Sequence, residues 1–323
     1  MNFGEKRDVV FGAGPVGLGV AERLRQMNRE VVLATRSGKA GASSGVTAVK
    51  ADLTKPDEVR HLATGADTVY LCASPPYHRW ADEFGPMMEG FVRGVEGTQA
   101  RIVLADNLYA YGPTTAPMTE TTPEQPTSVK GRVRRDAARR LMELNEAGNL
   151  RVAIGRAADF YGPRVVTSAL GLRVFQSIAR GKAAPCLGNV DLPHSYTFID
   201  DFARGLVILG TRDEALGKIW HIPSGPASTT REMVTLIAEA YAKPVRLMVA
   251  PRWLITVAAP FNSTMRELKE VLYQFEQPFI MDSSRFASAF GDHSTKPGDA
   301  IMKTIAWVRS GSSSATPVPA LEH

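Results

Sequence analysis

Short apolar runs alternate with amphipathic stretches through the first half of the chain. The apolar runs are rich in Val, Ile and Leu and predict buried strands, at residues 8–11, 31–35, 46–50, 67–73, 101–106 and 151–156. The stretches between them repeat apolar residues with helical spacing and predict helices, at residues 15–28, 56–63, 79–95 and 129–147. Because strands and helices alternate, we expect an α/β fold with a Rossmann-like, doubly wound parallel sheet.

The second half of the chain is less regular. Helical patterns occur at residues 168–180, 200–210, 229–241 and 263–275, a strand pattern at 218–222, and loops with Pro and Gly at 184–197 and 276–300. We expect a smaller, C-terminal substrate-binding lobe. The predicted division is a dinucleotide-binding domain at 1–165, to which segments near 195–222 return, a mainly substrate-binding part at 166–310, and a flexible tail at 311–323. The final Leu-Glu-His looks like a cloning remnant.

A glycine-rich turn joins the first predicted strand to the first predicted helix. Gly12, Gly14 and Gly17 have the spacing G-x-G-x-x-G, with Pro15 and Val16 inside it. The first glycine permits a tight turn, the second lets a pyrophosphate approach the backbone, and the third lets helix and sheet pack closely. The N–H groups that open the helix also attract phosphate. The turn therefore predicts a dinucleotide site, and the alternative is a glycine turn without a ligand.

The end of the second predicted strand indicates which dinucleotide is bound. Sites for NAD(H) usually place Asp or Glu there to hold the ribose 2′-hydroxyl, but this chain has Thr35, Arg36, Ser37, Gly38 and Lys39. An arginine can bind a phosphate with two hydrogen bonds and stack on adenine. We therefore expect NADP(H), with Arg36 and Ser37 among the residues that bind it. The alternative is that Arg36 and Lys39 are solvated loop charges.

The composition is that of an ordinary globular protein. Of the 323 residues, 44% are hydrophobic and 22% are charged, and no apolar run is long enough to span a membrane. Cys72 and Cys186 are too few for a disulfide framework or a zinc site, and no cluster of His, Cys and carboxylate has metal-ligand spacing. Since no signal peptide is recognisable, we expect a cytoplasmic protein with no metal and no membrane partner.

The net charge of +5 is concentrated in one stretch. Its cations, opposed only by Asp136, are Lys130, Arg132, Arg134, Arg135, Arg139 and Arg140. No aromatic residue lies among them, although proteins that bind single-stranded nucleic acid interleave aromatic and basic side chains. We therefore expect a small-molecule substrate and no nucleic-acid partner.

Several further segments, taken in order, carry a family resemblance. They are Asp52-Leu53, Ala73, Tyr111-Gly112, Arg156 with Tyr161-Gly162-Pro163, and the run from His194 to Asp201. Over nearly the whole chain their order resembles the extended short-chain dehydrogenase/reductase family, which includes nucleotide-sugar epimerases. The resemblance implies that Asp52 and Leu53 contact adenine, that Ala73 lies beside the cofactor, and that Tyr161 lies beside the nicotinamide.

The chain departs from that family at its catalytic positions. The family's Tyr-x-x-x-Lys pair falls on Lys130 and Arg134, its catalytic Ser or Thr falls on Asn107, and Phe11 replaces its first glycine. The resemblance therefore implies an atypical member, in which Lys130 and Arg134 share the helix face that points at cofactor and substrate. The alternative is that both residues belong to a solvated basic face.

These substitutions define the chemistry that we expect. Lys130 would supply or relay a proton and lie against the cofactor, while Arg134 would disfavour a second positive charge on that face and hold the ribose. Asn107 would hold a substrate oxygen through its amide N–H. Tyr109, which strand alternation from Asn107 turns into the cleft, is the alternative acid. Tyr111 is expected to pack structurally.

The loop after the fourth predicted strand borders the nicotinamide in this architecture. We expect it to reach the substrate through Tyr77, His78 and Trp80, with His78 as a less favoured proton donor.

Other candidate residues are expected to be structural. His194 would organise its loop, His221 would be a satisfied core histidine, and Asp200 and Asp201 look like a helix cap. Four aromatic residues are expected to pack in the core or, alternatively, to line an apolar substrate pocket: Trp253, Phe261, Phe275 and Phe279.

Together these residues predict an NADP(H)-dependent oxidoreductase that reduces a carbonyl, or an activated alkene beside one, in a small and partly apolar molecule. Loss of the family's catalytic residues favours one alternative, a non-catalytic NADP(H)-binding redox sensor. A second alternative is a nucleotide-sugar-type epimerase or dehydratase that retains its cofactor. The sequence is compatible with a monomer and with a homodimer. Relatives often dimerise through the helices at 79–95 and 129–147, but here the second helix is so basic that it would repel its copy in a dimer.

Overall fold

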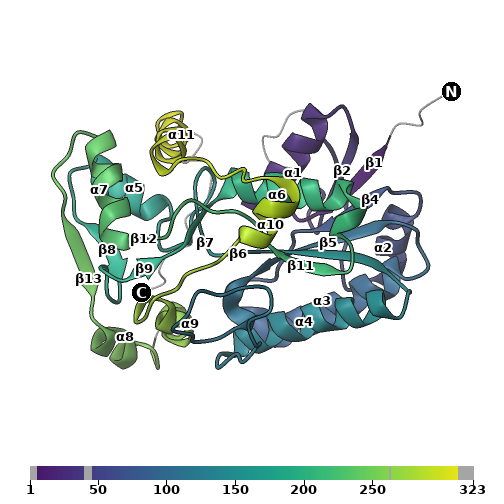
Figure 1. The fold of residues 1–323 in the computed structure, drawn as a ribbon, viewed down its shortest axis with the longest axis horizontal. Coiled ribbons are helices and arrows are strands. Elements are labelled where there is room, and N and C mark those ends of the chain that lie inside the picture. The colour runs from purple at the N-terminus through teal and green to yellow at the C-terminus, as the bar shows by residue number, and fades with distance from the viewer. Residues whose placement is uncertain (1–5, 40–45, 262, 312–323) are drawn as a thin grey trace.

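The computed structural model describes residues 6–39, 46–261 and 263–311. Seven strands form one parallel sheet in the order β11-β6-β5-β4-β1-β2-β3. Their bounds are β1 (Arg7–Phe11), β2 (Glu30–Thr35), β3 (Thr47–Lys50), β4 (Thr68–Leu71), β5 (Arg101–Asn107), β6 (Arg151–Ala157) and β11 (Lys218–His221). The strand order reverses between β1 and β4, which makes a topological switch point there. The expected Rossmann-like α/β fold is therefore confirmed (Figure 1).

Helices cover both faces of this sheet. On one face lie α1 (Pro15–Gln26) and α6 (Ile199–Thr211), and on the other lie α2 (Pro56–Ala63), α3 (Trp80–Val95) and α4 (Val129–Glu146) (Figure 1). Because successive strand residues point to opposite faces, Val9 and Phe11 pack with α3, whereas Val10 packs with α1 and α6. Both faces are apolar, as a sheet covered on both sides requires.

The smaller lobe is built from three pairs of short strands. They are β7 (Asp159–Tyr161) with β10 (Tyr196–Phe198), β8 (Ala184–Leu187) with β13 (Leu247–Ala250), and β9 (Pro193–His194) with β12 (Ser228–Thr229). Its helices are α5 (Leu172–Ala179), α7 (Thr230–Ala240), α8 (Arg252–Ala258), α9 (Ser263–Val271) and α11 (Pro297–Arg309). A separate core of buried apolar side chains joins α5, α7 and α11. The chain returns to the large sheet through α6, β11 and α10 (Ser284–Phe290).

The first-half prediction agrees with the observed strands and helices to within two residues at each end. Two predicted loops are wrong: 184–197 contains β8, β9 and β10, and 276–300 contains α10 and the start of α11. Strands of two to four residues are too short to show an alternation of apolar and polar residues. Such strands are therefore defined by the strands that pair with them and not by their own sequence. Of the predicted tail at 311–323, residues 312–323 lie outside the described residues.

The expected cap at Asp200 and Asp201 is also wrong. The N-cap of α6 is Phe198, and both aspartates lie in the first turn of the helix. Asp201 is buried, and its carboxylate accepts hydrogen bonds from the N–H of Thr295 at 2.6 Å and from the Thr295 hydroxyl at 2.7 Å. It therefore fastens the segment before α11 to α6 instead of capping its own helix.

Candidate active site

The glycine turn has the geometry of a dinucleotide cradle. Gly12 has φ of +104°, and a Cβ there would lie 2.7 Å from the Ala73 nitrogen, so the turn needs glycine for its conformation and for the close approach of β4. A Cβ at Gly17 would lie 1.9 Å from the Gly12 carbonyl oxygen, which shows how tightly α1 packs. A Cβ at Gly14 would instead meet no atom within 4 Å. The space beside the turn is therefore open at the glycine where a pyrophosphate would approach.

The start of α1 supports the same fit. Gly14 is the N-cap and is exposed, no side chain caps the helix, and Pro15 occupies its first turn next to Val16. The first N–H groups of such a helix lack partners within the helix and carry partial positive charge. These residues therefore fit a phosphate group, although whether they bind one stays a prediction.

The residues expected around the adenosine half lie along one edge of the sheet. Arg36 and Ser37 are exposed just after β2, and no carboxylate lies between Thr35 and Lys39. Asp52 follows β3 and accepts hydrogen bonds from the N–H of Thr54 at 2.9 Å and from its hydroxyl at 2.8 Å. These bonds, with the nearby charges of Lys55 and Arg36, hold the pKa of Asp52 below its ordinary value. Leu53 beside it is buried.

Lys130 lies in the first turn of α4, where the structure gives it two carboxylate partners from the smaller lobe. Its Nζ contacts Glu267 and lies 2.7 Å from Oε2 of Glu270, both on α9. Oε1 of Glu270 also accepts the Lys130 backbone N–H at 2.9 Å. The ammonium is almost completely buried and lies 4.6 Å from the centre of the Tyr77 ring. Lys130 is thus a buried, ion-paired group and not part of a solvated basic face.

Arg134 points away from this pair. Its Nε lies 2.6 Å from Oδ1 of Asp106, and Nη2 donates to the Ala105 carbonyl. Its guanidinium also lies over Trp80 and Phe84, with 5.6 and 5.0 Å to the ring centres. Separate carboxylates therefore balance Arg134 and Lys130. The predicted contact of Arg134 with the ribose stays a prediction.

Asp106 is the centre of a buried ion network that the sequence did not reveal. Its Oδ2 accepts from Nε of Arg156 at 2.8 Å, and Arg156 also lies 2.6 Å from Glu124. Burial by itself would raise the pKa of Asp106, but the guanidinium groups of Arg134 and Arg156 hold it below its ordinary value. Asp106 and Arg156 are partners in the register of β5 and β6, so this network joins two central strands to α4.

Tyr109 and Tyr77 face each other beside Lys130. Tyr109 lies in the short 3-10 helix Leu108–Ala110, and its hydroxyl is 3.3 Å from that of Tyr77. Burial raises the pKa of Tyr109 to about 12 and raises that of Tyr77 as well, so both hydroxyls stay protonated and can donate. Oδ1 of Asn107 accepts the Tyr109 N–H at 3.1 Å, which orients its side chain at the end of β5. The expected grouping of Asn107, Tyr109 and Lys130 is present.

The other predicted contacts are spread around this group. His78 is exposed on the 3-10 helix Tyr77–Arg79, whereas Trp80 is buried, with its indole N–H bonded to the Pro75 carbonyl at 3.0 Å. Ala73 is half-buried beside Gly12, and Tyr161 is buried against Phe198. Their contacts with cofactor or substrate stay predictions.

Two histidines are structural, as expected. His194 is buried between the rings of Phe275 and Phe279, and its Nε2 lies 2.9 Å from Asp159. Nδ1 of His221 donates to the Asp282 carbonyl at 2.9 Å, so Nε2 accepts the Tyr111 hydroxyl at 2.7 Å. Burial lowers the pKa of His221 to about 4, which keeps this ring neutral.

The four aromatic residues of the later segment separate into two pairs. Phe275 and Phe279 are buried, as core packing predicts. Trp253 and Phe261 are exposed, so neither lies in the core or lines an enclosed apolar pocket. The prediction that Trp253 and Phe261 pack in the core or line an apolar pocket was wrong. The identity of an apolar residue does not show whether its element faces the core or the solvent.

Four polar residues near Lys130 and Tyr109 were not predicted from the sequence. They are Glu267, Glu270, Tyr273 and Gln274. Within the described chain, the Tyr273 hydroxyl and Oε1 of Gln274 are buried without a hydrogen-bond partner. Buried polar atoms are rarely left unpaired, so such atoms are suited to meet a polar ligand. The only sequence signal was the i, i+3 spacing of the two glutamates on a predicted helix, which also describes a solvated face.

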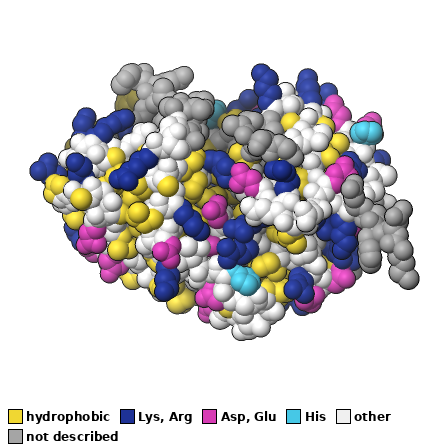
Figure 2. Space-filling model, turned by 90° about the horizontal axis from the view of Figure 1, so that it is seen from above, with side chains coloured by type: hydrophobic (Ala, Val, Ile, Leu, Met, Phe, Trp, Pro, Cys, Tyr) yellow, Lys and Arg dark blue, Asp and Glu magenta, His cyan; other side chains and the backbone are white. Residues whose placement is uncertain are grey.

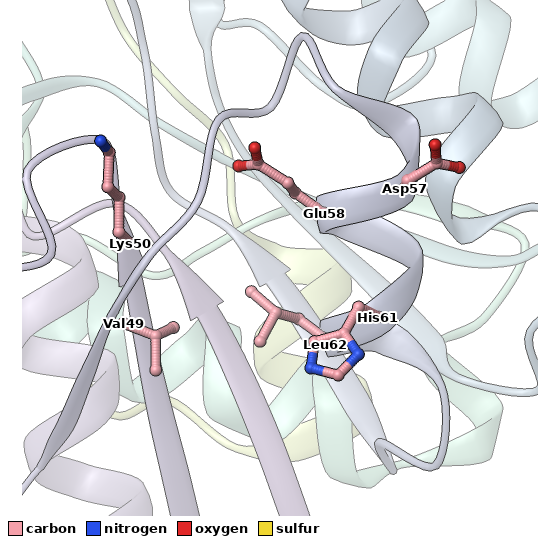
Figure 3. A pocket seen from close by; sticks show the side chains of 6 residues that line it. All are labelled: Val49, Lys50, Asp57, Glu58, His61 and Leu62. Carbon is pink, nitrogen blue, oxygen red and sulfur yellow. The ribbon is translucent and has the colours of Figure 1, made fainter.

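A shallow hollow of about 440 Å³ lies elsewhere, between β3 and α2 (Figure 3). It is lined by Val49, Lys50, Asp57, Glu58, His61 and Leu62. None of the candidate catalytic residues lines it. In the described ranges, no three His, Cys, Asp or Glu side chains are grouped to hold a metal ion. No helix of that part of the chain is long and apolar enough to cross a membrane.

Comparisons with known proteins agree with this architecture. The model of the NAD dependent epimerase/dehydratase family matches residues 9–222. A dTDP-glucose 4,6-dehydratase of Streptomyces griseus is 30% identical over 91 residues, which span 28% of this chain and 27% of that enzyme. This alignment therefore covers about a quarter of that relative.

Solved structures show a similar fold at low identity. An epimerase from Methanothermobacter thermautotrophicus superposes with a TM-score of 0.80 at 14% identity, covering 96% of this chain and 94% of the other. UDP-glucuronic acid 4-epimerase from Bacillus cereus, solved with UDP-glucuronic acid and NAD, gives 0.76 at 17% identity over 94% and 99%. The expected resemblance to extended short-chain dehydrogenases/reductases is confirmed, and the chain belongs to the NAD dependent epimerase/dehydratase family.

Proposed function

We propose that this chain is a pyridine-nucleotide-dependent oxidoreductase of the epimerase/dehydratase type, which retains its dinucleotide during the reaction. The observation that carries this proposal is the open glycine turn at the uncapped start of α1, beside the switch point of the sheet. When bound, the dinucleotide supplies a hydride acceptor and donor for one substrate carbon. The family match and the NAD that is bound by the similar Bacillus cereus epimerase support this choice over a freely exchanging reductase.

The proposed dinucleotide is NADP(H). Arg36 is exposed just after β2, and the segment from Thr35 to Lys39 contains no carboxylate, so Arg36 offers a cation to a 2′-phosphate. Arg36 and Ser37 hold this phosphate, and the glycine turn holds the pyrophosphate.

The residues around Tyr109 handle the proton and the substrate oxygen. Tyr109 donates its proton to the substrate oxygen when hydride reaches the carbonyl carbon, and it takes the proton of the substrate hydroxyl when hydride leaves that carbon. Tyr77 donates a hydrogen bond to the Tyr109 oxygen. The Asn107 amide holds the same oxygen. Lys130 stabilises the negative charge on the substrate once the substrate displaces one of its two glutamates. The unpaired Tyr273 hydroxyl and Gln274 Oε1 favour a substrate with several polar groups.

A second candidate function is the reduction of a carbonyl or activated alkene by an exchangeable NADPH. It is favoured by the replacement of the family's catalytic Tyr and Lys by Lys130 and Arg134. The two candidates differ in whether the purified protein carries its dinucleotide.

The first experiment is therefore to denature the purified protein and to identify any nucleotide released by its absorbance and mass. Release of near-stoichiometric dinucleotide supports the epimerase/dehydratase type. A nucleotide-free protein that binds added NADPH with micromolar affinity supports the exchangeable reductase. If neither occurs, the glycine turn is structural and both proposals fail.

The proton-handling roles need matched variants. Lys130→Met and Tyr109→Phe should each leave nucleotide binding within a few-fold but lower turnover by about 100-fold or more, the usual loss on removing an acid–base group. Lys218→Met is the control and should keep full turnover, because Lys218 is exposed at the first residue of β11, at the opposite edge of the parallel sheet from the glycine turn. Normal turnover in Lys130→Met and Tyr109→Phe would remove these residues from the mechanism, while full nucleotide binding with no turnover of any substrate would favour the redox sensor.

A further inference from the structure

Exposed apolar side chains gather in one short segment of the smaller lobe. Six of the ten large hydrophobic side chains that are exposed in the described part of the chain lie at residues 245–261. They are Val245, Met248, Val249, Trp253, Val257 and Phe261, and we call this set the 245–261 patch. Met248 and Val257 are each 62% exposed, Trp253 is 66% exposed and Phe261 is 91% exposed. Single exposed apolar residues are ordinary, but Trp253 and Val257 lie one turn apart on α8 and form an apolar group of the kind that marks an interaction surface.

The elements that carry the patch lie at the outer end of the lobe. β13 is paired with β8, and α8 follows it directly, at the end of the molecule away from the large sheet (Figure 1). Trp253 and Val257 are one helical turn apart, whereas Ile255 between them is buried. The helix therefore has one face packed on the protein and one apolar face directed outward.

The charge of this segment has one sign. From Ala242 to Phe261 the sequence contains no Asp or Glu, but it contains Lys243, Arg246 and Arg252, which are all exposed. Of these, Arg252 also lies 3.2 Å from Glu276. On the face of the molecule seen in Figure 2, Lys and Arg side chains are mixed with Asp and Glu. The 245–261 patch therefore fits a partner that is both apolar and anionic.

A second copy of this chain does not fit that description. Two patches placed face to face would bring together Lys243 and Arg246 from each copy with no acidic residue of the segment between them, which is repulsive. An anionic lipid surface does fit, because Trp, Phe and Val enter the boundary of headgroups and acyl chains while Lys and Arg stay at the phosphates. We propose that the 245–261 patch docks this protein on anionic membranes.

This inference is independent of the proposed function and differs from the sequence expectation of no membrane partner. It describes a protein that lies on the bilayer and does not cross it, in agreement with the lack of a membrane-spanning helix in the described residues. α8 packs against α9, whose glutamates hold Lys130, so the docked face adjoins the candidate active site.

Vesicle co-sedimentation of the full-length protein tests the proposal. We expect binding to vesicles of equal parts phosphatidylcholine and phosphatidylglycerol, and little binding to phosphatidylcholine alone. Binding should weaken as salt rises, because the Debye length falls from about 10 Å at 0.1 M to about 3 Å at 1 M. The double variant Trp253→Ser with Phe261→Ser should bind at least about tenfold more weakly, since it removes the two aromatic anchors. Both side chains are exposed, so the fold does not depend on them.

Met302→Ser is the matched control, because Met302 is an exposed apolar residue of α11 outside the patch. It should bind vesicles like the unaltered protein. The Trp emission of the unaltered protein should also shift to the blue with anionic vesicles, and Trp253→Phe should abolish that shift. The proposal is overturned if the unaltered protein does not bind anionic vesicles, or if the double variant binds them as well as Met302→Ser does. It is also overturned if sedimentation velocity shows that Trp253→Ser converts a dimer to a monomer.

Discussion

The buried carboxylate of Asp106 gives the sharpest test of how this site is held together. Asp106→Asn keeps the shape of the side chain but removes its charge. Arg134 then has no carboxylate partner and keeps its bond to the Ala105 carbonyl, while Arg156 still has Glu124 at 2.6 Å. Breaking a buried ion pair by removing one partner costs about 3–5 kcal/mol. Because Glu124 continues to balance Arg156, we expect a loss of about 3 kcal/mol, near the lower end of that range.

The assay is thermal unfolding followed by far-ultraviolet circular dichroism. A loss of this size should lower Tm by roughly 4–5 °C in a protein of this length. The pKa of Asp106 is lower in the folded chain than in the unfolded chain, so its stabilisation is complete above the unfolded pKa of about 3.9. The difference in stability between the unaltered protein and the Asp106→Asn variant should therefore stay constant from pH 8 to pH 5 and shrink only below about pH 4.

Asp213→Asn is the matched control. Asp213 also pairs with two arginines, Arg101 at 2.6 Å and Arg151 at 3.1 Å, but its side chain is 69% exposed. Solvent screens such a pair, so Tm should hardly change. If Asp106→Asn lowers Tm no more than Asp213→Asn does, the buried network does not stabilise the site.

Three further outcomes follow from the structure. Gly17→Ala should lower both Tm and nucleotide affinity, because its Cβ would lie 1.9 Å from a carbonyl oxygen. Gly14→Ala should keep Tm but lose nucleotide affinity at least about tenfold in a fluorescence titration. Equal losses of Tm in the two variants would contradict this prediction. Arg36→Ala should weaken NADPH binding by about tenfold or more and leave NADH binding nearly unchanged, and a parallel loss for both nucleotides would disprove a role at the 2′-phosphate. The pKa of His221 is lowered to about 4 in the folded chain, so the unfolded chain takes up a proton first as the pH is lowered. The free energy of unfolding should therefore decrease as the pH is lowered from about 6.5 to about 4, by up to about 1.4 kcal/mol per pH unit. In His221→Gln, Tm should depend less steeply on pH across this range.

The sequence by itself determined the large sheet and the nucleotide turn. The strands from β1 to β6, and the helices between them, follow from apolar runs and helical spacing, which are properties of neighbouring residues. The roles of Gly12 and Gly17 follow in the same way, because their spacing places them at the turn and at the close contact of α1. The family resemblance indicated Asn107 at the end of β5. Tyr109 was inferred from strand alternation, but it lies in the 3-10 helix that follows the strand.

Tertiary structure alone decided the partners of these residues. Glu267 and Glu270 meet Lys130 across 137 and 140 positions of sequence, and no local pattern encodes such a contact. The apolar residues Trp253 and Phe279 look alike in the sequence, yet one is 66% exposed and the other is buried. Burial and charge pairing depend on which elements pack together, so the environment of Lys130 and the 245–261 patch are properties of the folded chain and not of its local sequence.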